Sequence, residues 1–157
     1  MAVRKGNIGA VLILSAISLS TAGAKPRLLP PSAFPELPPA VIQTLQARGC
    51  QIPQIQRRKR DNVIRGEFLK SGQTDWAVLC TTKKLTELLV LENGSADQVV
   101  VIASFSNGFA KWTIGPIAAH DFPKEWLLKD GSLPLDHDGI SSFAEFGYRV
   151  DGCLYCY

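Results

Sequence analysis

The sequence predicts an α+β domain: an antiparallel β-meander of five or six short strands, with one short N-terminal helix packed on it and a disulfide as a staple. Three observations predict this class. Residues 62–105 alternate between short apolar, β-branched runs and pairs of turn residues. A stretch before them has apolar residues at helical spacing. Four cysteines follow an export signal, so they reach a compartment where disulfides persist.

The chain begins with the three parts of a secretory signal peptide. Arg4 and Lys5 form a positive n-region, residues 8–19 form an apolar stretch, and Ala22-Gly23-Ala24 offers the small residues that a signal peptidase reads. The rival interpretation is an uncleaved membrane anchor, but a spanning helix needs about 20 apolar residues. We therefore expect residues 1–24 to be removed. The mature chain then has no transmembrane segment and is periplasmic or secreted.

Removal of this segment also changes the size and the charge of the protein. Of the 157 residues, 133 remain, which is the size of one domain. The formal net charge falls from +3 to +1, because Arg4 and Lys5 leave without an acid. A near-neutral chain lacks the basic surface that nucleic-acid binders use. We therefore expect no nucleic-acid partner.

A proline-rich arm comes next, at residues 25–39, and a single α+β domain covers residues 40–157. The arm holds six prolines, which disfavour helix, so it is expected to be extended. It either lies along the domain through Leu28, Leu29 and Phe34 or projects as a spacer.

The expected helix runs from Pro39 to Ala47, with Gly49 as its stop. Strands are expected at about 62–69, 76–82, 86–91 and 99–105, and short strands on short turns pair antiparallel with their neighbours. The turns between them are expected at Ser71-Gly72, Lys83-Lys84 and Asn93-Gly94-Ser95.

The rest of the chain has weaker signals. Asp121-Phe122-Pro123 predicts a brief helix through Leu128, and residues 131–140 are expected to form a loop. A last strand is expected from Phe143 to Val150, before a hairpin turn at Asp151-Gly152.

The mature chain keeps four cysteines: Cys50, Cys80, Cys153 and Cys156. Four cysteines allow three pairings, and the sequence alone does not choose among them. Cys50 follows the expected helix and Cys80 ends an expected strand, so our interpretation is a structural bridge between these two. Cys153 and Cys156 have the CxxC spacing of redox pairs, but their neighbours are aromatic and apolar and no helix follows to activate a thiolate. We interpret them as structural too.

The densest polar cluster is Asp136-His137-Asp138. A carboxylate beside an imidazole can perform acid–base catalysis or ligate a metal. One hypothesis is therefore a small hydrolase or metal-assisted enzyme that uses these three residues, with Asp75 as a further candidate. Neighbouring residues in a loop rarely converge on one point, so we prefer a turn in which the Asp side chains accept backbone N–H groups. No residue pattern indicates a cofactor or a metal.

Residues 66–79, GEFLKSGQTDWAVL, resemble one blade motif of the FG-GAP and VCBS type of β-propeller repeat. Those repeats usually bind calcium through side-chain oxygens in the turn, where this chain has Leu69-Lys70-Ser71. The motif occurs once, whereas a propeller needs several blades. The resemblance therefore implies a hairpin, without a metal. The matching positions are Gly66-Glu67-Phe68, Gly72, Asp75 and Ala77-Val78.

A longer pattern is similar to a group of exported bacterial proteins of unknown function. It runs from Arg48-Gly49-Cys50-Gln51-Ile52-Pro53 through residues 62–66 to Cys80 and includes His137-Asp138-Gly139-Ile140. The resemblance implies a bacterial periplasmic or secreted protein and supplies no activity. Our preferred hypothesis is a non-enzymatic domain that binds a protein or a cell-envelope component, and the enzyme above is the alternative.

Overall fold

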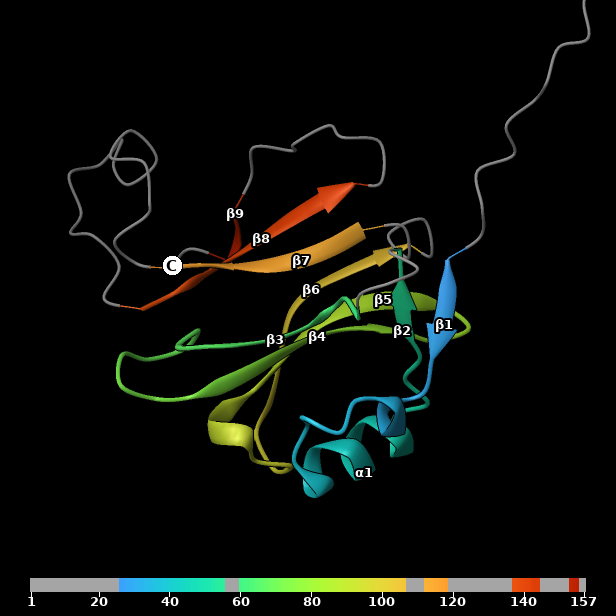
Figure 1. Ribbon diagram of the computed structural model, residues 1–157, viewed down its shortest axis with the longest axis horizontal. Coiled ribbons are helices and arrows are strands. Elements are labelled where there is room, and N and C mark those ends of the chain that lie inside the picture. Colours follow the sequence, from blue (N-terminus) through green and yellow to red (C-terminus); the bar gives the residue numbers. More distant parts are fainter. Residues whose placement is uncertain (1–25, 56–59, 107–111, 119–136, 145–152, 156–157) are drawn as a thin grey trace, which may run out of the picture.

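The computed structural model describes residues 26–55, 60–106, 112–118, 137–144 and 153–155 (Figure 1). All strand pairs in it are antiparallel, in a four-stranded sheet of order β3-β4-β5-β6, a three-stranded sheet β7-β8-β9 and a two-stranded sheet β1-β2. The elements are β1 (Arg27–Leu29), the 3-10 helix η1 (Pro31–Ala33), α1 (Pro39–Ala47), β2 (Ile52–Gln54), β3 (Val63–Gly66), β4 (Asp75–Thr81), β5 (Leu85–Leu91), the 3-10 helix η2 (Glu92–Gly94), β6 (Val99–Ser106), β7 (Trp112–Ile117), β8 (Gly139–Ala144) and β9 (Cys153–Tyr155).

The predicted class is confirmed: the described residues form mostly antiparallel sheet together with one α-helix. The predicted meander corresponds to β3, β4, β5 and β6, which follow one another along the chain and across the sheet. The strand count was too low, because β1, β2, β7, β8 and β9 form further sheets. The predicted helix from Asp121 to Leu128, and the part of the last predicted strand beyond Ala144, lie outside the described residues.

Local turn chemistry explains the boundaries in the first part of the chain. The helix α1 begins at Pro39 and ends at Ala47, as predicted, and Gly49 follows with a φ of 72°. Asn93 and Gly94 both have positive φ, 52° and 65°, in the connection between β5 and β6. A left-handed pair of this kind is what an Asn-Gly hairpin turn requires.

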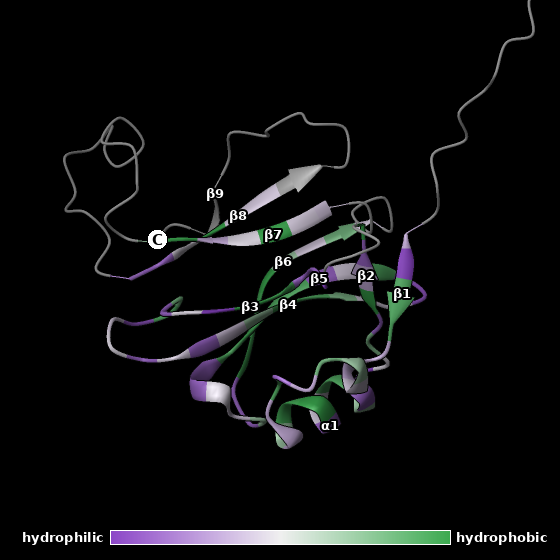
Figure 2. Ribbon diagram, in the orientation of Figure 1, coloured by the Kyte–Doolittle hydropathy of each residue, from purple (hydrophilic) through white to green (hydrophobic). Residues whose placement is uncertain are grey.

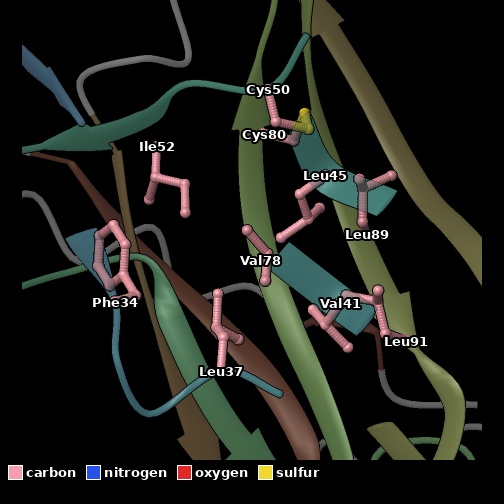
Figure 3. Close-up of a cluster of buried hydrophobic side chains, with 10 residues drawn as sticks. All are labelled: Phe34, Leu37, Val41, Leu45, Cys50, Ile52, Val78, Cys80, Leu89 and Leu91. Carbon is pink, nitrogen blue, oxygen red and sulfur yellow. A yellow bond between two sulfur atoms is a disulfide. The ribbon is translucent and has the colours of Figure 1, made fainter. Parts of the chain in front are cut away.

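The four-stranded sheet is the middle layer of the molecule, with α1 on one face and the sheet β7-β8-β9 on the other (Figure 1). Side chains alternate along β4, so Val78 and Cys80 face the helix while Ala77 and Leu79 face the second sheet. The helix-side core is drawn in Figure 3 and consists of Phe34, Leu37, Val41, Leu45, Cys50, Ile52, Val78, Cys80, Leu89 and Leu91. The sheet-side core consists of Phe68, Ala77, Leu79, Leu88, Val90, Ile114 and Ile140.

The proline-rich arm lies along the domain. β1 pairs with β2, and beyond it Phe34 and Leu37 are buried in the helix-side core. Proline has no N–H donor, so a proline-rich segment has fewer backbone donors to satisfy when it packs against a sheet. Figure 2 shows hydrophobic residues both along α1 and through the middle of the sheet that it covers.

The two larger sheets meet at Asn62, whose side chain is buried and whose φ is 68°. Its Nδ2 donates to the carbonyl oxygens of Pro53, at 2.7 Å, and of Trp112, at 2.9 Å. Its Oδ1 accepts from the backbone N–H of Ile114 at 2.8 Å. The side-chain amide therefore takes the place of a peptide group between the start of β3 and β7. At the other edge, β9 comes close to β6.

The sequence did not predict β7, and it placed the start of β8 in a loop. Residues Gly139 and Ile140 lie in the predicted loop 131–140 but begin β8. β7 contains Gly115 and Pro116, which are unfavourable inside a strand. Pairing explains both strands, because β7 and β8 are matched over their full lengths, from Trp112 opposite Ala144 to Ile117 opposite Gly139.

Candidate functional site

The structure brings part of the predicted acid cluster to the connection between β3 and β4, residues 67–74. Asp75 is the first residue of β4, directly after this connection. His137 and Asp138 lie just before β8, and Asp138 reaches the same connection from a distant part of the chain. Asp136 lies outside the described residues.

The carboxylate of Asp75 is fully buried and accepts four hydrogen bonds. Its Oδ2 accepts from the backbone N–H groups of Phe68, at 3.1 Å, and Leu69, at 2.9 Å. Its Oδ1 accepts from Gln73 Nε2 and from the backbone N–H of Asn93, both at 2.8 Å. A carboxylate offers about four lone-pair positions, so all the acceptor capacity of Asp75 is in use. This side chain fixes the β3–β4 connection and ties it to the β5–β6 connection.

Asp138 is joined to Glu67 by a pair of hydrogen bonds. Asp138 Oδ2 accepts from the backbone N–H of Glu67 at 3.0 Å, and the backbone N–H of Asp138 donates to the Glu67 carbonyl oxygen at 2.8 Å. The two residues are 71 positions apart, so the carboxylate has a long-range structural role. The expected turn would have placed its partner close by in the sequence.

Close packing also explains why the blade-like motif has a glycine at position 66. A Cβ atom on Gly66 would lie 2.6 Å and 2.7 Å from two ring carbons of Phe68 and 3.0 Å from Asp138 Oδ2. The Phe68 ring is itself fully buried in the sheet-side core. The motif residues Gly66, Phe68 and Asp75 therefore serve packing and backbone hydrogen bonding.

His137 is buried, and its Nδ1 lies 3.0 Å from the carbonyl oxygen of Asp138. A carbonyl oxygen only accepts, so in this hydrogen bond Nδ1 carries the proton. Within the residues that the structure describes, no group of three or more His, Cys, Asp or Glu side chains is placed to hold a metal ion. Asp75 and Asp138 therefore hold the β3–β4 connection in place through hydrogen bonds to its backbone.

A metal-uptake measurement tests this assignment. After dialysis against Zn²⁺, Mn²⁺ and Ca²⁺, we expect no stoichiometric metal in the wild-type protein or in His137→Ala, because the Asp75 and Asp138 carboxylates already accept backbone hydrogen bonds. Metal content is measured by elemental analysis of both samples. One equivalent in the wild type that is missing from the variant would restore the metal-assisted alternative.

The predicted bridge between Cys50 and Cys80 is present and buried. The two Cα atoms are 5.1 Å apart, and the bridge closes a separation of 30 residues. It joins the end of the α1 segment to β4, while Arg48 and Glu87 form an ion pair at 3.5 Å between the same segment and β5. The side chain of Cys153 and the whole of Cys156 lie outside what the structure describes.

Sequence reasoning missed the outer strand β6 as a candidate interaction surface. Among the described strands, β6 is the last in the order of the four-stranded sheet, and it pairs with β5. Two consecutive valines on it are exposed, Val100 by 38% and Val101 by 45%. The signal was visible in the sequence: β6 reads VVVIASFS and has no charged residue, whereas natural edge strands are usually protected by charges or proline.

The two exposed valines lie on opposite faces of the four-stranded sheet. Val100 pairs with Val90, which belongs to the sheet-side core, and Val101 pairs with Leu89, which belongs to the helix-side core. Directly paired residues of an antiparallel ladder share a face. Each core layer therefore ends in an exposed valine at the β6 edge.

No family model matches the chain, and no curated protein and no solved structure matches it. In the described part of the chain, no helix has the length and hydrophobicity needed to span a membrane.

Proposed function

We propose that the protein is an exported, disulfide-stapled, non-enzymatic domain that binds another protein at the edge of β6. The binding mode is strand addition, in which an extended segment of the partner pairs with the outer edge of a sheet. Export is supported by the signal-like residues 1–24 and agrees with the buried Cys50–Cys80 bridge.

The observation that carries the proposal is the exposure of Val100 and Val101 on opposite faces of one edge. A helix or a flat surface would cover only one face of the sheet. An added strand sends alternate side chains to both faces and so extends both core layers at once. The partner segment is therefore extended, uncharged and apolar, like β6 itself. Among the described strands, β9 also comes close to β6, and it has three residues where β6 has eight.

The alternative, a small hydrolase or metal-assisted enzyme using Asp136, His137 and Asp138, receives less support. A general base or a metal ligand needs free lone pairs directed at a substrate or an ion. The Asp75 carboxylate accepts four hydrogen bonds and Asp138 Oδ2 accepts the N–H of Glu67. Both carboxylates therefore already bind backbone N–H groups of the connections between strands.

A labelled peptide of residues 97–106, DQVVVIASFS, is the probe for strand addition. We expect the wild-type domain to bind it and Val101→Lys to bind it at least about tenfold more weakly, because a charged side chain at the edge opposes pairing with an apolar strand. Leu28→Lys is the matched control, since Leu28 is 43% exposed on β1, in the separate two-stranded sheet. Affinity is measured by fluorescence anisotropy.

A scrambled peptide of the same composition controls for general hydrophobic binding. Equal affinities for the two peptides, or equal effects of Val101→Lys and Leu28→Lys, would contradict strand addition at β6.

A further inference from the structure

We infer that the segment bound at β6 is β6 of a second copy of this chain, so that the protein forms a symmetric dimer through its sheet edge. The inference rests on the proposed function and names the partner. β6 has the chemistry that its own edge requires: it is extended, eight residues long, uncharged, and has apolar side chains directed to both faces.

The exposed valines place the contact in the first half of the strand. Val100 and Val101 are the exposed large hydrophobic residues of β6, whereas Phe105, in the second half, packs against the sheet-side core. Pairing centred on Val100 or Val101 covers both side chains in both copies. Burial of apolar surface on both faces adds to the backbone hydrogen bonds of the new strand pair.

Charge at the end of the strand selects the antiparallel orientation. Asp97 lies two residues before β6 and is exposed. In a parallel pair, the Asp97 side chains of the two copies would lie close to each other, which is unfavourable. In an antiparallel pair, each Asp97 lies beyond the opposite end of the paired segment, away from its counterpart.

Symmetry makes this contact self-limiting. When two identical strands pair antiparallel, a two-fold axis normal to the sheet relates one strand to the other. Such an isologous interface closes at two copies. Rotation about this axis does not exchange the two faces of the sheet, so α1 of both copies lies on the same side of one continuous sheet. Val101 of each copy then extends the helix-side layer, and Val100 extends the opposite layer.

The test is the mass of the mature protein in solution, measured by sedimentation velocity over a dilution series. We expect a dimer for the wild type, a dimer for Leu28→Lys, and a dimer dissociation constant raised by about tenfold or more for Val101→Lys. Circular dichroism and the melting temperature show whether each variant is folded. A second measurement needs no variant: excess peptide of residues 97–106 should convert the wild-type dimer to monomer.

The outcomes separate this inference from the function on which it rests. A wild-type monomer that still binds the β6 peptide overturns the dimer and keeps strand addition to a different protein. A monomer that does not bind the peptide overturns both. A dimer that resists Val101→Lys and the peptide overturns the β6 contact, because the interface then lies elsewhere.

Discussion

Replacing Asp75 with alanine is expected to lower the free energy of unfolding by about 3–5 kcal/mol. The change removes the acceptor for the backbone N–H groups of Phe68, Leu69 and Asn93 at a fully buried position. A buried donor left without a partner costs about 1–3 kcal/mol. The β3–β4 and β5–β6 connections lose their common anchor together. Urea unfolding followed by circular dichroism measures the effect.

The matched control for this prediction is Asp97→Ala. Asp97 is an aspartate too, but it is exposed and lies in the connection between β5 and β6, so its replacement is expected to change stability by no more than about 0.5 kcal/mol. Equal stabilities of Asp75→Ala and Asp97→Ala would show that the buried carboxylate does not hold the two connections together.

The second large effect is expected from the disulfide. In the double variant Cys50→Ala/Cys80→Ala, the free energy of unfolding should fall by about 2–5 kcal/mol, because the unfolded chain regains the freedom of the closed loop. The bridge spans a separation of 30 residues and both half-cystines are buried, so the variant also loses packing in the helix-side core. Thermal and urea unfolding of the oxidised proteins measure the difference.

Reduction provides the control for the disulfide. Dithiothreitol should lower the melting temperature of the wild-type protein more than that of the double variant, which no longer has this bridge. If both proteins lost the same amount, the stabilisation would come from elsewhere in the chain, and the stapling role of Cys50 and Cys80 would be wrong.

The parts of the fold that the sequence predicted depend on signals within short windows. Pro39 and Gly49 bracket α1, and the turn residues Asn93 and Gly94 separate two apolar runs, so the helix and the strands β3 to β6 were expected close to their observed places. The sequence left three pairings of the four cysteines open, and our interpretation, a bridge from the end of the helix segment to a strand, is confirmed by the Cys50–Cys80 disulfide.

Long-range pairing explains what the sequence did not predict. The sequence of β7 contains Gly115 and Pro116, and only its partner β8 makes it a strand. The role of Asp138 depends on Glu67, 71 residues away, and no local pattern encodes that contact. Asn62 was expected to begin a strand, but its side chain replaces a peptide group between two sheets.

The candidate surface at β6 depends on long-range pairing as well. The uncharged run in β6 was visible in the sequence, but its position at the edge of the sheet depends on the order of four strands. The opposite directions of Val100 and Val101 depend on the register with β5. Composition alone therefore could not distinguish this strand from a buried central one.

Hydrogen–deuterium exchange in β6 tests strand addition most directly. The wild-type protein is compared with Val101→Lys, and each is measured with and without the peptide of residues 97–106. We predict that the peptide or a second copy slows exchange within Val99–Ile102 of the wild type, because outward backbone N–H groups become paired. The same amides should stay fast in Val101→Lys, and those of β1 should not change. Binding at the β6 edge would be contradicted by protection confined to the β3–β4 connection, to which Asp138 is bonded. It would also be contradicted by equal exchange of Val99–Ile102 in both proteins.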